Sequence, residues 1–161
     1  GLMIRVPTNA IQTKGFEVLG ATPVGMALGD VYTALQQGTI DACENAVGNM
    51  LINRYYEIIK HVTNTKHQFT YILIGVSDRA WKKIPDDLKP KVYEAMKIAS
   101  AWQRQNLQDI NNNAINELKT KGVTFHDIDR EALKAKALPA VEALRKNVPE
   151  EWLDAYKEAV K

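Results

Sequence analysis

The chain has 161 residues, of which 45% are hydrophobic and 25% are charged, and these fractions are ordinary for a globular domain. Its 21 basic and 19 acidic side chains leave a formal net charge of +2, which is too small to indicate binding of nucleic acid or of an acidic membrane surface. No apolar run is long enough to span a bilayer. Cys43 is the only cysteine, which excludes an internal disulfide and a cysteine zinc site.

Residues 1–8, GLMIRVPT, predict a short strand that ends at Pro7, because proline cannot donate a hydrogen bond to a sheet ladder. They resemble neither a signal peptide nor a flexible tail, so the chain either starts on this strand or is cut from something longer. The strand places Arg5 near its carboxyl end, and open α/β sheets bind ligands outside that end. An arginine there can pair with a ligand carboxylate through its planar fork. The strand alone also allows Arg5 to pair with a surface acid.

The first part of the chain alternates between strands and helices. After the first strand we expect a helix over 9–19, a short strand within 21–28, a helix over 30–38, a strand over 39–44 and a helix over 45–60. The expected N-caps of these helices are Thr8 or Asn9, Asp30 and Asn45. Such alternation predicts an α/β fold with a parallel or mixed sheet covered by helices.

The second part contains one unusually long helical segment. The expected elements are a strand over 61–77 with a bend near Thr70, a helical turn over 78–83, a helix over 85–122, a strand over 123–128, a helix over 129–148 and a helix over 149–161. An unbroken helix over 85–122 would be about 54 Å long. It must therefore either cross from one body to another or bend in its polar stretch. We further expect a kink at Pro139 and inward-facing Trp152 and Tyr156.

Asn45 is the second candidate for ligand binding, since it stands at an expected strand-to-helix turn. Its amide and the free backbone N–H groups of a helix start would suit a ligand carboxylate or hydroxyl. The alternative is an ordinary helix cap. Nearby Asp41 and Glu44 could act as an acid–base pair, but they lie on opposite faces of the expected strand and are better interpreted as separate structural acids.

Catalytic and metal sites find little support in the sequence. Cys43 and His67 could form a nucleophile and base, but nothing around them resembles a cysteine hydrolase. His61, His67 and His126 could bind a metal, but they share no helical spacing and have no companion cysteine. We therefore expect no catalytic residue, no metal ligand and no cofactor.

Four segments of the chain follow one another as they do in a known family. These are GLMIRVPTN, LGATPVGMALGDVYTALQQGTIDACEN, RYYEIIKHVTNTKH and VSDRAWKKIPDDLK. The chain resembles the C-terminal half of a solute-binding protein of tripartite ATP-independent periplasmic (TRAP) transporters, the DctP-like family. The resemblance covers nearly the whole chain and is strongest over residues 1–70.

The resemblance implies a periplasmic protein with two α/β lobes, joined by crossing strands and a long helix, that traps an organic acid in the cleft. The protein would pass the acid to the membrane subunits of the transporter. Arg5 matches the arginine that binds the ligand carboxylate, and Asn45 matches the asparagine of the family's E-N pair. The remaining substrate-binding residues expected from the resemblance are Thr8, Asn9, Leu28 and Thr70. Leu28 stands where relatives often have an aromatic residue, which implies a different ligand shape.

The resemblance also implies how the chain is divided. Residues 1–70 and 111–161 would form one ligand-binding lobe, and residues 71–110 would cross into a second lobe whose main body is absent. The apolar segment 71–77 would then lack its partners, so we expect the chain to form a homodimer, to swap segments or to bind its missing N-terminal half. Two alternatives are a ligand-sensing domain of a signalling protein with the same fold and an enzyme that depends on Cys43.

Overall fold

Three parallel strands lie at the centre of the lobe in the order β2–β1–β3: β2 (Thr22–Gly25), β1 (Met3–Val6) and β3 (Ala42–Cys43). The computed structural model describes residues 1–146 and 148–159. Arg5 of the central strand is in register with Val24 on one side and Cys43 on the other. Every pairing between described strands is parallel, which is one of the two arrangements predicted.

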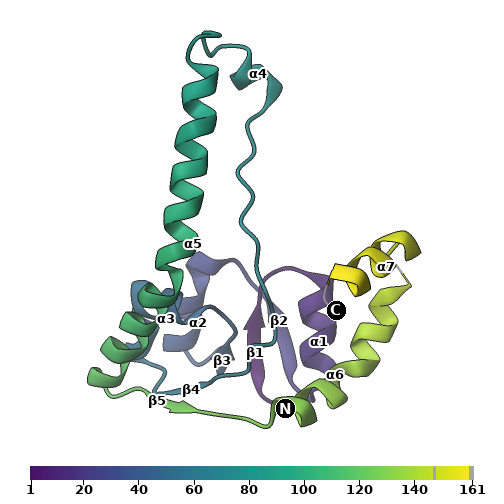
Figure 1. Ribbon diagram of the computed structural model, residues 1–161. Coiled ribbons are helices and arrows are strands. Elements are labelled where there is room, and N and C mark those ends of the chain that lie inside the picture. Colours follow the sequence, from purple (N-terminus) through teal and green to yellow (C-terminus); the bar gives the residue numbers. More distant parts are fainter. Residues whose placement is uncertain (147, 160–161) are drawn as a thin grey trace.

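Helix α1 (Ala10–Val18) covers one side of this sheet, and helix α6 (Arg130–Arg145) packs against α1 (Figure 1). Helix α1 starts after Asn9, whose Oδ1 accepts a hydrogen bond from the Ile11 N–H at 2.8 Å. Helix α6 starts after Asp129, whose Oδ1 accepts from the backbone N–H groups of the first turn. The predicted caps at Asn9 and Asp129 are thus confirmed.

The C-terminal helices differ from prediction in one respect. Helix α6 continues as one element through Pro139, and α7 (Glu150–Ala159) follows it. Trp152 and Tyr156 were predicted to face inward, but both are 66% exposed, so that prediction is wrong. The reason is that α7 follows the outer end of α6, away from the main core (Figure 1), and neither ring belongs to that core. Residues 147, 160 and 161 of the two predicted helices lie outside the described residues.

The main core lies on the other side of the sheet. It is formed by the short helices η1 (Leu28–Asp30), α2 (Val31–Gln36), α3 (Val47–Ile52) and η2 (Tyr55–Glu57) with the lower end of the long helix. Its buried members are Val31, Ala34, Leu35, Ile40, Met50, Tyr55, Leu118 and Val123.

The single helix predicted over 45–60 is wrong, because the chain turns at Arg54, which has a left-handed φ of 59°. On one continuous helix Met50 and Tyr55 would point about 140° apart. The turn allows both side chains to enter the same core, and Tyr55 is 1% exposed. Tertiary burial therefore overrides the local helical pattern.

A second, two-stranded sheet lies along the lower edge of the lobe (Figure 1) and consists of β4 (His61–Thr63) and β5 (Thr124–His126). The strand predicted over 61–77 is thus confirmed only at its start. Residues 64–77 have no regular secondary structure, and their large apolar side chains are 41–90% exposed. A strand requires a hydrogen-bonded neighbour, and beyond Asn64, whose N–H donates to the His126 carbonyl, none of the described residues provides one for this segment.

Two segments extend away from the lobe as limbs, and these are residues 64–77 and helix α5 (Lys89–Thr120). The short helix α4 (Asp78–Trp81) joins the two limbs at the top (Figure 1). There Trp81 packs edge to face on Tyr93 with ring centroids 5.2 Å apart. Helix α5 is one unbroken element of 32 residues, or about 48 Å, and starts four residues later than predicted. Only its lower end, at Ala114 and Leu118, is fully buried.

We expect the lower end of α5 to carry its stabilising contacts. Leu118→Ala should lower the free energy of unfolding by about 2–5 kcal/mol, because Leu118 is 0% exposed within the core. The matched control is Leu73→Ala on the limb, where the side chain is 90% exposed and the change should stay within about 0.5 kcal/mol. Urea unfolding of both variants measures this difference. An equal loss at Leu73 would show that the limb is covered in solution.

Candidate functional site

Arg5 is the one buried charged side chain among the described residues, with 4% of its surface exposed. Its Nε and Nη2 atoms both donate to the carbonyl oxygen of Met26, at 2.9 and 2.8 Å. No carboxylate of the described residues lies within ion-pair distance of the guanidinium. A cation removed from water without a counterion is costly. The lobe therefore presents a positive charge that an anion would stabilise.

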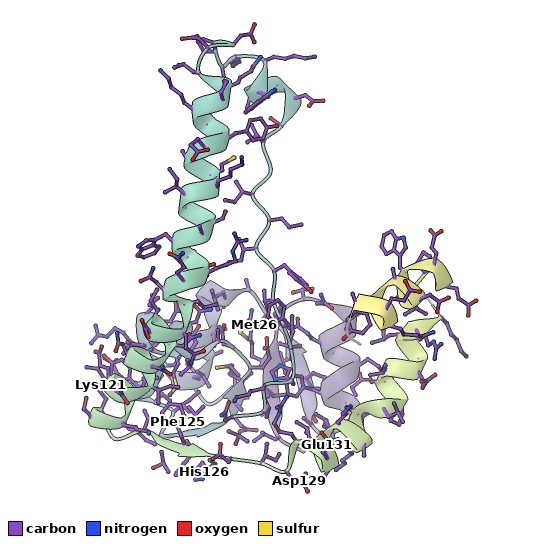
Figure 2. The ribbon with its side chains drawn as sticks, viewed as in Figure 1. Met26, Lys121, Phe125, His126, Asp129 and Glu131 are labelled. Carbon is purple, nitrogen blue, oxygen red and sulfur yellow. The ribbon has the colours of Figure 1, made fainter. Side chains whose placement is uncertain are left out.

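The carboxyl ends of the three parallel strands position this charge. The Met26 N–H donates to the Val6 carbonyl at 3.1 Å, and the Glu44 N–H donates to the Arg5 carbonyl at 3.1 Å. These bonds extend the pairing of β1 with both neighbours just past the strand ends. Figure 2 shows Met26 at the upper edge of the sheet, the side from which the limbs rise. Arg5 thus stands where α/β folds bind ligands, as the sequence predicted.

Asn45 follows β3 at the same edge of the sheet, but it is not the N-cap that the sequence predicted. Helix α3 starts at Val47 with Ala46 as its N-cap, and it has six residues. The Oδ1 atom of Asn45 accepts hydrogen bonds from the Ala46 N–H at 2.8 Å and from Asn49 Nδ2 at 2.7 Å. These bonds fix the amide plane and leave Nδ2 without a partner among the described residues. A fixed amide donor of this kind suits a ligand oxygen.

The other predicted residues lie in different surroundings. Thr8 is exposed and lies against Gly25 at the end of β2, next to the Arg5 edge. Asn9 uses its side-chain oxygen to cap α1. Leu28 is 43% exposed, and its carbonyl accepts from the Tyr55 hydroxyl at 3.4 Å. Thr70 is exposed on the limb formed by residues 64–77. The ligand-binding role of each stays a prediction.

A polar cluster at the end of β3 was missed by the sequence analysis. Gln12 Nε2 donates to Gln68 Oε1 at 2.6 Å and lies 3.5 Å from Glu44 Oε1. His67 Nε2 lies 3.5 Å from the other oxygen of Glu44, and its ring packs edge to face on Phe16. These contacts attach the base of the limb to α1 and to the end of β3. No local pattern could indicate them, because the partners are 23–56 residues apart along the chain.

Tyr55 is a second residue that sequence reasoning did not connect with the site. It is buried below the loop after β2, where its hydroxyl holds the Leu28 carbonyl. Burial raises the pKa of Tyr55, the nearby Cys43 adds to that rise, and the positive charge of Arg5 opposes it. The Tyr55 ring and the Cys43 side chain thus form an apolar floor of low dielectric near the guanidinium.

The catalytic alternatives find no support in the geometry. Burial raises the pKa of the Cys43 thiol to about 11, and the smaller opposing effect of Arg5 does not offset it. The Nδ1 atom of His67 lies 2.7 Å from Thr65 Oγ1 rather than near Cys43. Asp41 accepts from the Met3 N–H at 2.8 Å, whereas Glu44 contacts Gln12 and His67, so the two acids have separate partners as predicted.

The three histidines do not gather at one place. His67 belongs to the cluster with Glu44, whereas His61 and His126 lie together on the two-stranded sheet. Within residues 1–146 and 148–159, no group of three or more His, Cys, Asp or Glu side chains could hold a metal ion. None of the helices described has both the length and the apolarity needed to cross a membrane.

The fold and the site define a lobe of a solute-binding protein, and comparison with known families agrees. The model of the DctP family, "Bacterial extracellular solute-binding protein, family 7", matches residues 1–147. The chain therefore belongs to the DctP family, as its motifs implied. It is 32% identical over 151 residues to the solute-binding protein RD1_1052 of Roseobacter denitrificans, covering 94% of this chain and 46% of the relative. It is 28% identical over 163 residues to the C4-dicarboxylate-binding periplasmic protein DctP of Rhodobacter capsulatus, covering 99% and 49%.

Solved structures show the same fold. A TRAP periplasmic solute-binding protein from Polaromonas sp. JS666, bound to D-erythronate, superposes with a TM-score of 0.88 at 29% identity over 96% of this chain and 52% of that one. RD1_1052 with bound L-galactonate superposes with a TM-score of 0.86 at 28% identity, covering 100% and 53%. The chain thus spans about half the length of these relatives, and the expected fold class is confirmed.

The thiol of Cys43, which is partly buried, yields a direct test of the site's surroundings. With its pKa raised from 9.0 to about 11, Cys43 should hold roughly a hundredfold less thiolate at pH 8 than an unperturbed cysteine. Its reaction with iodoacetamide should be slower by a similar factor in the folded chain than in guanidinium chloride. Equal rates in the two conditions would contradict the buried position of Cys43 and reopen its interpretation as a nucleophile.

Proposed function

We propose that this chain is the C-terminal part of a TRAP transporter solute-binding protein that binds an organic acid through Arg5 and delivers it to the transporter's membrane subunits in the periplasm. The observation that carries the proposal is the buried guanidinium without a carboxylate partner among the described residues. Membership of the DctP family supports it, as do the sugar acids bound by two relatives of the same fold.

The binding chemistry follows from the unused donors. Met26 occupies one edge of the Arg5 fork, so the remaining N–H groups can donate to both oxygens of a carboxylate. Asn45 Nδ2 offers a further donor at the same sheet edge, suited to a hydroxyl next to the carboxylate. Leu28 and the Cys43–Tyr55 floor add apolar surface that lowers the local dielectric and strengthens the ion pair. No bond of the ligand is made or broken in this proposal.

The limbs suggest how the ligand would be enclosed. We place residues 1–70 and 111–161 in one lobe and assign residues 71–110 to the second lobe of the longer protein. Most large apolar side chains of the limbs are exposed, including Leu73 at 90% and Trp102 at 59%. The chain spans about half of its relatives, so a second body of similar size could cover these surfaces. Closure of two lobes around a hinge would trap the acid between them and form the surface that the membrane subunits recognise.

Arg5→Ala in the longer protein should weaken binding of its acid by a few hundred-fold or more, because loss of a buried charge partner costs roughly 3–5 kcal/mol. Arg5→Lys should bind with intermediate affinity, since lysine retains the charge without the fork. The measurement is calorimetry with an acid found by thermal-shift screening of sugar acids and dicarboxylates.

The control for this series is Arg54→Ala, which removes an arginine that is exposed and paired with Glu57. Its affinity should match that of the unmodified protein. If Arg5→Ala left the affinity unchanged as well, Arg5 would not be the carboxylate anchor and the proposal would fail at its central residue.

The exposed limbs also predict association of the 161-residue chain by itself. Six large apolar side chains of residues 64–77 are exposed in the chain, and an unpaired extended segment of this kind invites pairing with another copy. We expect a concentration-dependent dimer in sedimentation velocity, weakened by the double change Ile72→Lys and Ile74→Lys. A chain that stays monomeric at high concentration would contradict this expectation.

A further inference from the structure

The histidine pair on the two-stranded sheet is placed by backbone pairing. Strands β4 and β5 run parallel, with His61 opposite Thr124 and Thr63 opposite His126. The two histidines are therefore diagonal neighbours on one face, and both are exposed. Additional backbone bonds hold each end of the pairing, from the Thr124 N–H to the Lys60 carbonyl at 2.8 Å and from the Asn64 N–H to the His126 carbonyl at 2.9 Å.

The side chains meet across this frame. His61 Nδ1 lies 3.0 Å from His126 Nε2, and the two ring centroids are 5.2 Å apart with the planes inclined by 36°. Imidazole nitrogens bind divalent transition metals, and no carboxylate of the described residues ion-pairs with either ring. Figure 2 shows His126 at the lower edge of the lobe, away from Met26 and the Arg5 site.

We propose that His61 and His126 form a two-histidine site for a single divalent transition-metal ion, with water completing the coordination. Bonds from a metal to imidazole nitrogens are about 2.0–2.1 Å long. Two such bonds to nitrogens 3.0 Å apart meet at the ion at roughly 95°. This angle matches two adjacent positions of a square-planar or octahedral ion and is smaller than the tetrahedral angle. Cu²⁺ and Ni²⁺ adopt such geometries and bind imidazole ligands well, so they are the ions we assign to this site.

Binding requires small rearrangements that the surroundings allow. In the hydrogen-bonded pair, one of the two facing nitrogens carries a proton. With the metal bound, neither facing nitrogen carries a proton. The ring protons then lie on His61 Nε2 and His126 Nδ1, so binding of the ion to two neutral rings releases no proton. Each ring must also turn so that its lone pair points to the common ion, and exposed side chains can do so at little cost. The ion would then link a residue before the limbs to one after them, across 65 positions of sequence.

The test is a titration of the untagged chain with Cu²⁺ in excess glycine, which suppresses binding by single histidines, followed by calorimetry and electron paramagnetic resonance. We expect one ion per chain with splitting from two imidazole nitrogens. His61→Asn and His126→Asn should each weaken binding by about tenfold or more. The matched control, His67→Asn, changes the third histidine of the chain and should leave this site intact.

A second readout follows the stability of the fold. Ni²⁺ should raise the melting temperature of the unmodified chain and of His67→Asn, because an ion that binds only the folded state stabilises it. It should not raise that of His61→Asn or His126→Asn. Equal Cu²⁺ affinity in the unmodified chain and both single variants, or a spectrum with one nitrogen ligand, would overturn the proposal.

Discussion

The burial of Arg5 is the constraint on which the rest of the lobe depends. A guanidinium that is 4% exposed is tolerated only where its N–H groups find acceptors, and the Met26 carbonyl provides one for two of them. That carbonyl is in place because the loop after β2 continues the pairing with β1. The same loop then reaches Leu28, whose carbonyl Tyr55 holds from below. The charge is thus fixed by the protein's own backbone, and in the proposed function this would reduce the cost of ordering the site on binding.

Helix α5 shows two environments along one element. Its lower end is sealed in the core at Ala114 and Leu118, whereas Trp102 and Tyr93 higher up are 59% exposed. An amphipathic helix of a self-contained domain keeps its large apolar residues on the core side. The exposed upper part therefore fits a helix shared between two bodies, as the proposed two-lobe protein requires. The polar cluster of Gln12, Glu44 and His67 attaches the other limb at its base to α1 and to the end of β3.

Sequence signals were reliable where the physics is local. The caps at Asn9 and Asp129 satisfy free N–H groups two or three residues away, and Gly122, with a φ of 82°, follows the end of α5 as a glycine should. The predictions failed where distant packing decides. The helix predicted over 45–60 breaks at Arg54 so that Tyr55 can enter the core, and most of the strand predicted over 61–77 has no neighbour to pair with.

The sequence by itself determined the α/β alternation, the family and the place of Arg5 near the carboxyl end of the first strand, because these follow from patterns within short windows. Only the tertiary structure decided that Arg5 is buried, that it is held by a carbonyl 21 residues away, and that no described carboxylate pairs with it. The meeting of His61 with His126 was decided in the same way. Contacts between residues so far apart in the sequence depend on how the strands pair and on which side chains fill the core. Local conformational preferences carry no information about either.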